Sequence, residues 1–311
     1  MKKILVVLLS LVVVTGMFAQ ATVNGYVRST TTIDKDGNMA YAGRLRLNLN
    51  FTSEDKNFSM FTRLQDSTSF GAAPGISYAN GTAKLFDGMV IVNAGKLSNY
   101  DYNFGCGVSE YKLGAISNDG YAMDGTLGTV VEVLPMAGLN VGLAIIPKTP
   151  NTLSAEDFGV SVKYALEGLG TVVVESTLAN DVSKSRISAS FKYTGVENLD
   201  VAVGYKGLSS VGVYAIANYK MDALSVQVVP QVTIPTTGDT QIYVEGDVTY
   251  NMAPMAFNVL FAYDTTKATL AASYFAGLEA IYTVGKLKAL TGFWYNDVAG
   301  VTIPIEVRVS F

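Results

Sequence analysis

The sequence predicts an all-β fold in which antiparallel strands close into a barrel, and three observations support that prediction. First, apolar residues recur with a period of two along almost the whole chain, as they do in strands with one apolar face. Second, hydrophobic residues make up 49% of the chain and charged residues only 15%, whereas about 25% of an average globular protein is charged. Third, no run of roughly 18 apolar residues that could form a transmembrane helix follows the N-terminal segment. Such a chain is expected to cross a membrane with strands, as an antiparallel transmembrane β-barrel.

The N-terminal segment has the organisation of an export signal. Lys2 and Lys3 precede an apolar stretch that extends from Ile4 to Val14, and small residues around Ala19 fit a cleavage site. We therefore expect residues 1–19 to be a signal peptide, with residue 21 as the latest cleavage point. Residues 22–311 are expected to form a single barrel domain.

The first part of this domain contains strand-like runs at 22–33, 42–51, 57–65, 81–86 and 89–97. The turn sequences DKDGN, SEDKN and DG lie between them. The alternation is cleanest in the second run, AGRLRLNLNF, where leucines and a phenylalanine alternate with arginines and asparagines. One face of such a strand is apolar and the other is polar.

The remaining runs follow an irregular stretch and are separated by turn sequences such as PMAG, EGLG, VENLD and NMAP. They lie at 126–134, 139–146, 157–166, 170–179, 185–194, 199–207, 211–220, 223–234, 240–250, 256–264, 268–284, 286–296 and 301–311. Treating 268–284 as one long strand gives 18 strands, and merging one weak hairpin gives 16. We therefore expect about 16–18 strands, because an even number places both ends of the domain on the periplasmic side.

Aromatic residues near the strand ends fit the girdles that membrane barrels place at the two lipid–water interfaces. They are Tyr193, Tyr219, Tyr250, Tyr263, Trp294 and Tyr295. The alternation by itself would also fit a secreted β-sandwich, in which the polar face is in water and the apolar face is in the core.

The last run, VTIPIEVRVSF, ends in an apolar row that includes Val307, Val309 and Phe311. Together with the signal peptide, this strand resembles the assembly signal of bacterial outer-membrane β-barrel proteins, in which a final Phe completes the outward row. The resemblance implies that Phe311 is an assembly signal. It also implies that outer-membrane lipid and the barrel assembly machinery are partners of the chain.

The order of the runs over the whole mature chain is similar to that of the general porins of Gram-negative outer membranes. The long irregular stretch, SNYDYNFGCGVSEYKLGAISNDGYAMDG at 98–125, follows the fifth run. In general porins the third outer loop, after strand five, folds into the barrel and narrows the channel. The acidic loop motif of the family is not recognisable here, and the direction of this long third loop stays open. The resemblance implies a homotrimer and a passive channel for ions and small hydrophilic solutes.

Five arginines are expected on one wall of the lumen, because their runs become neighbours when the barrel closes. They are Arg28, Arg44, Arg46, Arg63 and Arg308. The long loop offers acids that could face them, namely Asp101, Glu110, Asp119 and Asp124. The resemblance to porins implies a transverse field between such a basic wall and an acidic loop, which would orient solutes and bias ion choice. Alternatively, the arginines only satisfy loop carboxylates and pack, without a role in solute passage.

Other acids should point into the lumen by alternation. They are Glu132, Glu175, Glu245, Asp247 and Glu306. The chain contains no histidine, so histidine-dependent acid–base catalysis is excluded and a usual zinc site cannot form around the single Cys106. We expect no enzyme activity, no metal and no cofactor, and the mildly acidic balance gives no reason to expect nucleic-acid binding. The alternative function is a structural or adhesive outer-membrane barrel without an open pore.

Overall fold

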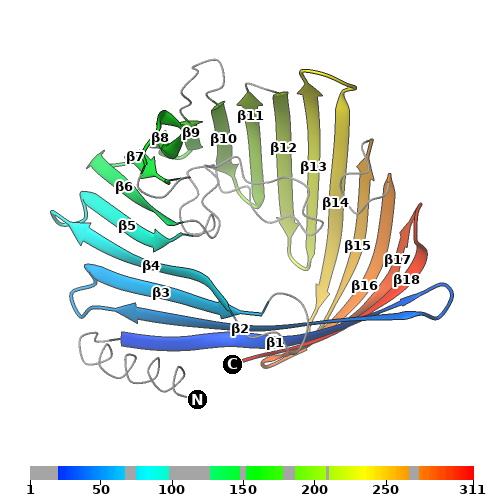
Figure 1. Ribbon diagram of the computed structural model, residues 1–311. Coiled ribbons are helices and arrows are strands. Elements are labelled where there is room, and N and C mark those ends of the chain that lie inside the picture. Colours follow the sequence, from blue (N-terminus) through cyan, green and yellow to red (C-terminus); the bar gives the residue numbers. More distant parts are fainter. Residues whose placement is uncertain are drawn as a thin grey trace.

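The computed structural model describes residues 20–66, 75–97, 127–147, 152–177, 186–207, 210–265 and 273–311. These residues form a single antiparallel β-sheet that closes on itself (Figure 1). Its strands are β1 (Gln20–Asp34), β2 (Met39–Thr52), β3 (Phe58–Gln65), β4 (Gly75–Leu85), β5 (Val90–Lys96), β6 (Leu127–Met136), β7 (Leu139–Ile145), β8 (Phe158–Leu166), β9 (Gly170–Thr177), β10 (Arg186–Val196), β11 (Leu199–Gly207), β12 (Ser210–Met221), β13 (Leu224–Pro235), β14 (Gln241–Met252), β15 (Met255–Asp264), β16 (Tyr274–Val284), β17 (Leu287–Asn296) and β18 (Gly300–Ser310). One short 3-10 helix, η1 (Ala155–Asp157), precedes β8.

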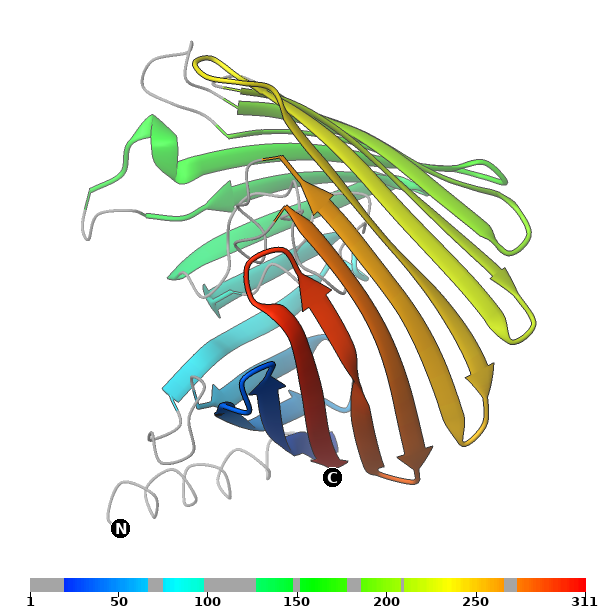
Figure 2. The same ribbon diagram turned by 90° about the vertical axis from the view of Figure 1, so that its right-hand side faces the viewer.

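Each strand pairs with its neighbours in the sequence, and one further pairing, between β1 and β18, closes the barrel (Figure 2). In that pairing Tyr26 lies opposite Ser310, and Asp34 lies opposite Thr302. The pairing continues to Phe311, whose backbone N–H donates to the Gly25 carbonyl at 3.1 Å, while the Gly25 N–H donates to the Phe311 carbonyl at 3.2 Å. Closure leaves no unpaired sheet edge, which is the condition for a sheet to lie in lipid.

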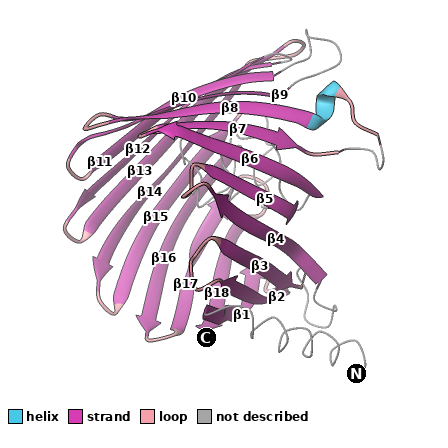
Figure 3. Cartoon of the chain, turned by 90° about the vertical axis from the view of Figure 1, so that its left-hand side faces the viewer, coloured by secondary structure: helices cyan, strands magenta, loops and turns pink. Residues whose placement is uncertain are grey.

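The connections at the two ends of the barrel differ in length (Figure 3). The end at which β1 begins and β18 ends has short turns at 53–57, 86–89, 137–138, 167–169, 197–198, 222–223, 253–254 and 285–286. The two-residue turns use left-handed backbone at Asn198 (φ 64°) and Asp222 (φ 49°), as tight hairpins require. The longest connections, at 66–74, 97–126, 146–157, 178–185 and 265–273, are all at the opposite end, although the connections 208–209 and 297–299 there are also short. Short turns at one end and longer loops at the other are typical of membrane barrels.

The outer face of the barrel is apolar and exposed. On β18 the outward row predicted from the sequence is present, and Val309 and Phe311 expose 47% and 44% of their surface. The inner face carries most of the charged and amide side chains, as the lumen-facing row of β14 shows with Glu245, Asp247 and Thr249. Polar residues inside and apolar residues outside are the reverse of a soluble β-sandwich.

Among the described residues, the inner face also carries buried apolar side chains, and two clusters of them lie on β11 to β17. One consists of Ala202, Tyr214, Ile216 and Val229 on β11 to β13. The other consists of Tyr243, Leu260, Ala262 and Phe275 on β14 to β16, with Trp294 of β17 packed against it. The prediction that Trp294 belongs to an outer aromatic girdle is therefore wrong. Trp294 lies opposite Thr302 and Gly277 on inward-facing rows. Its indole N–H donates to the inward-facing carboxylate of Glu279.

The predicted fold class is confirmed, and the structure has 18 strands in the expected order. The run 268–284 was predicted to be one long strand. In the structure it contributes one strand, β16, which begins later than predicted, at Tyr274, and ends at Val284. β4 begins at Gly75, earlier than the predicted 81–86, because PGISYAN contains turn-forming residues that masked its extended conformation. No helix in the described part of the chain is long and apolar enough to cross a membrane.

Candidate channel lining

Strand register gathers basic side chains into one row across the barrel wall. Arg28 of β1 lies directly between Arg308 of β18 and Arg44 of β2. Lys288 of β17 lies opposite Arg308 and extends the row to four strands. The sequence prediction missed Lys288, although alternation within KLKALTGFWYN places it on the polar face. Like charges directly opposite each other destabilise a sheet, so this row is unfavourable for folding.

Aromatic rings and amides hold the neighbouring arginines in place. The guanidinium groups of Arg46 and Arg308 lie 5.2 Å and 4.1 Å from the centroid of the Tyr26 ring. Nε of Arg46 also donates to Oε1 of Gln65 at 2.7 Å. These cation–π contacts and the neutral acceptor position the charges without cancelling them.

Arg63 is held in the same way on β3. Its Nε donates to Oδ1 of Asn48 at 2.8 Å, and its guanidinium lies 4.9 Å from the Tyr78 ring centroid and 5.3 Å from that of Phe61. Its positive charge is therefore oriented, but it is not paired with a carboxylate in the described part of the chain.

One carboxylate approaches this arginine wall, which comprises Arg28, Arg44, Arg46, Arg63 and Arg308. Oε2 of Glu306 lies 3.7 Å from Nη1 of Arg28 and accepts from the Thr30 hydroxyl at 3.5 Å. No other ion pair to the five arginines occurs among the described residues. Within those residues, Nε of Arg28 and Nε of Arg44 are also buried without a hydrogen-bond acceptor. The wall therefore carries a net positive charge.

The other predicted lumen acids all lie on inward-facing rows, distributed over three strands. Glu132 is on β6 and Glu175 on β9, while Glu245 and Asp247 are on β14. Glu245 accepts a hydrogen bond from the Tyr243 hydroxyl, and Asp247 accepts from the Thr249 hydroxyl at 3.2 Å. They surround the lumen rather than form one cluster, and their effect on solute passage stays a prediction.

A further lumen acid, Glu279 of β16, was missed by the sequence prediction. Its carboxylate accepts from Nδ2 of Asn258 at 2.9 Å and from the Trp294 indole N–H at 3.1 Å. Alternation in YFAGLEAIYTV places Glu279 inward, so the sequence contained the signal. The predicted loop acids Asp101, Glu110, Asp119 and Asp124 lie outside the described residues, as does Cys106.

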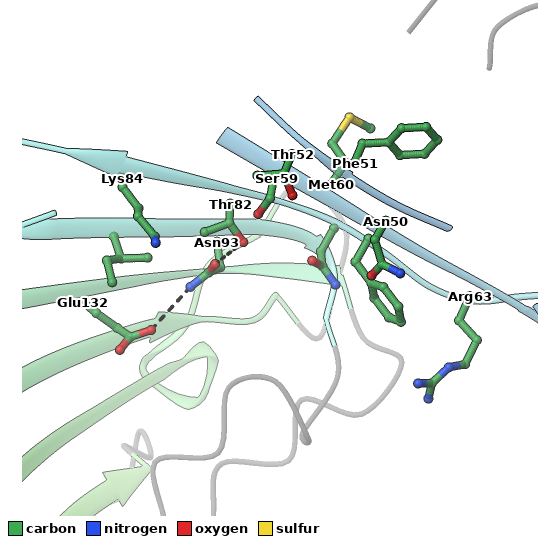
Figure 4. Close-up of a pocket in the computed structure, with 13 residues that line it drawn as sticks. Asn50, Phe51, Thr52, Ser59, Met60, Arg63, Thr82, Lys84, Asn93 and Glu132 are labelled. Carbon is green, nitrogen blue, oxygen red and sulfur yellow. Dashed lines mark hydrogen bonds between the residues drawn. The ribbon is translucent and has the colours of Figure 1, made fainter. Parts of the chain in front are cut away.

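A polar hollow of about 550 Å³ lies in the inner wall over β2 to β6 (Figure 4). Amide and hydroxyl side chains such as Asn50, Ser59 and Asn93 line much of it. Figure 4 shows Arg63 at one end and Lys84 with Glu132 at the other. The hollow is therefore polar, and it carries charges of both signs.

These features define the class of protein as a closed transmembrane β-barrel with a polar lumen. No family model matches the sequence, and no curated protein matches it either. Solved structures of Rhodopseudomonas blastica porin variants do match. One is 16% identical and covers 94% of this chain and 100% of its own, with a TM-score of 0.59. Another is 17% identical over the same shares, with a TM-score of 0.57. The chain therefore has the fold of a porin barrel, and the resemblance predicted from the sequence is confirmed at the level of the fold.

Proposed function

We propose that this protein is an outer-membrane porin, a passive diffusion channel for ions and small hydrophilic solutes. The observation that carries the proposal is the closed 18-stranded barrel with charged and amide side chains on its inner face. A barrel of this size is too wide for side chains alone to fill, so a water-filled lumen is the expected content. Transport through it requires no covalent chemistry.

The arginine wall is the feature proposed to tune ion choice. Its net positive charge raises the local concentration of anions and favours their passage beside it. We propose that the loop acids Asp101, Glu110, Asp119 and Asp124 oppose this wall and produce a transverse field across the channel. Glu132, Glu175, Glu245 and Asp247 would then set the potential in the other sectors of the lumen.

The route to the membrane and the oligomeric state belong to the same proposal. Residues 1–19 are proposed to direct export and to be removed, and Phe311 is proposed to be read by the barrel assembly machinery. The apolar outer face supports residence in lipid. The homotrimer is carried over from the resemblance to general porins.

The test is the conductance of single channels in a planar bilayer with a salt gradient, read together with the reversal potential. We expect stepwise conductance with anion preference at the wall, and the double charge reversal Arg44→Glu/Arg46→Glu should shift the reversal potential toward cation preference. The matched control is Lys163→Glu/Lys192→Glu, which reverses two basic residues on the inward rows of β8 and β10, away from the wall. Correctly folded protein that leaves the bilayer silent would contradict the channel and favour a structural or adhesive barrel.

A further inference from the structure

The polar hollow over β2 to β6 holds two opposite charges that do not pair with each other. Lys84 of β4 and Glu132 of β6 both face Ile91 of β5 in the strand register. Two strand spacings separate their backbones by about 10 Å. Within the described part of the chain, the Lys84 side chain makes no hydrogen bond or ion pair, and Glu132 makes no ion pair. The two charges therefore face the hollow from either side of Ile91.

The Glu132 carboxylate is fixed by neutral donors. Nδ2 of Asn140 donates to Oε2 at 2.5 Å, and Nδ2 of Asn93 lies 3.4 Å from Oε1. Asn93 is held in turn, because the Thr82 hydroxyl donates to its Oδ1 at 2.6 Å (Figure 4). Amides orient the carboxylate but leave its negative charge uncompensated. A cation that enters the hollow would find this acceptor already oriented, so little of the binding energy is lost to ordering.

On the other side of Ile91, the positive charge of Lys84 is more flexible than the Glu132 carboxylate. Lys84 is exposed, and its long side chain can place the ammonium group over a range of positions above Ile91. The side chain of Ile91 lines the hollow between the two charges and offers an apolar contact. The arrangement of positive charge, short apolar surface and fixed negative charge is complementary to a small molecule with a carboxylate, an aliphatic carbon and an ammonium group.

We propose that the hollow is a binding site for small zwitterions of the α-amino acid class. The solute carboxylate contacts Lys84, its ammonium group contacts Glu132, and its aliphatic part lies on Ile91. This inference rests on the proposed function, because the solute reaches the hollow through a water-filled lumen. A zwitterion has no net charge, so the positive arginine wall does not exclude it from the channel.

The first experiment compares three ligands of the same carbon skeleton on the unaltered protein, folded in detergent micelles. L-Alanine carries both charges, lactate only the negative charge, and isopropylammonium only the positive charge. Titration calorimetry should show alanine binding tighter than either of the others by about tenfold, since it makes both charged contacts. Binding of alanine that is no tighter than the binding of lactate or of isopropylammonium would overturn the proposal.

The second experiment uses variants whose folding is checked by heat-dependent migration in gels. Lys84→Gln and Glu132→Gln should each weaken alanine binding by about tenfold. The exchanged variant Lys84→Glu/Glu132→Lys should recover part of it, because the zwitterion can bind in the reverse orientation. Lys163→Gln, on the inward row of β8, is the matched control and should bind as the unaltered protein does. Unchanged binding in both single variants would overturn the proposal, and if they do not fold, the three-ligand comparison still decides.

Current block by alanine in the bilayer separates this inference from the function on which it rests. Normal conductance without alanine binding would overturn the zwitterion site and leave the channel intact. Binding in micelles with no conductance would support the site and contradict the channel. Block that is lost in Glu132→Gln while conductance persists supports both.

Discussion

At the scale of single residues, the inner wall shows how charges can be kept in an unfavourable arrangement. Arg46 and Arg63 each have a neutral acceptor and an aromatic ring. Arg44 faces Arg28, and its buried Nε has no acceptor among the residues that the structure describes. Neighbouring arginines on one wall therefore differ in what they contribute to stability.

This difference predicts opposite effects for two similar substitutions. Arg44→Gln removes one member of the basic row, so the barrel should gain about 0.5–1 kcal/mol of unfolding free energy at low salt, and the gain should shrink at high salt. Arg46→Gln removes contacts with Gln65 and Tyr26 and should lower the unfolding free energy instead. Urea unfolding in micelles at two salt concentrations measures both, and a loss of stability in Arg44→Gln equal to that in Arg46→Gln would contradict the prediction.

At the scale of elements, the short turns fix the hairpins. In the turn between β2 and β3, the Asp55 carboxylate accepts from the Ser53 hydroxyl at 2.5 Å and from the Asn57 backbone and side-chain N–H groups at 3.0 Å each. These hydrogen bonds, that from Ser53 first, lower the pKa of Asp55 below its usual value. The ionised carboxylate is therefore part of the turn.

The lowered pKa gives this turn a pH dependence of defined sign. A carboxylate whose pKa is lower in the folded state stabilises the fold above its unfolded pKa, and that contribution is lost as the pH falls through the folded pKa. We expect Asp55→Asn to reduce the loss of stability on acidification, compared with Glu54→Gln in the same turn as the control. Urea unfolding at neutral and acidic pH measures the difference, and an identical acid profile in Asp55→Asn and the unaltered protein would refute the role of Asp55.

The strands and their order were predicted from the sequence more completely than the contacts between side chains on different strands. Period-two alternation and turn sequences located the strands in their order, because both signals are local. Trp294 was placed on the wrong face because an aromatic near a strand end fits a girdle as well as a lumen hydrogen bond to Glu279. The basic row required the register between β17, β18, β1 and β2, which no local pattern contains. The position of the polar hollow likewise depends on which side chains become neighbours across β2 to β6.

At the scale of the whole molecule, the strands that close the barrel meet at a crowded position, Gly25. Gly25 lies where β1 meets both β2 and the end of β18, and a Cβ at this position would lie 2.1 Å from the Arg46 carbonyl oxygen and 3.0 Å from the Phe311 ring. The first of these neighbours is backbone, which cannot rotate away. Only glycine fits this position without moving one of the strands that close the barrel.

Gly25→Ala is therefore expected to lower the yield of closed barrel substantially. Gly81→Ala is the matched control, because the nearest atom to a Cβ there is the Ser59 carbonyl oxygen at 3.9 Å. The fraction of refolded protein that resists unfolding in cold detergent gels measures the yield. Equal yields for the two variants would show that the strands at the closure adjust freely.

The closing pair also differs from every other pair in how far apart its strands lie along the chain. All other neighbouring strands are consecutive in the sequence, whereas Arg28 and Arg308 meet across nearly the entire chain. Hairpins form with little loss of chain entropy, but joining distant segments is slow because the loop between them must first be ordered. The hairpins can therefore form early, while the edges of β1 and β18 stay unpaired until the last step. During that interval both edges are open to pairing with other chains, so the time to closure is also the time during which this protein is most exposed to aggregation.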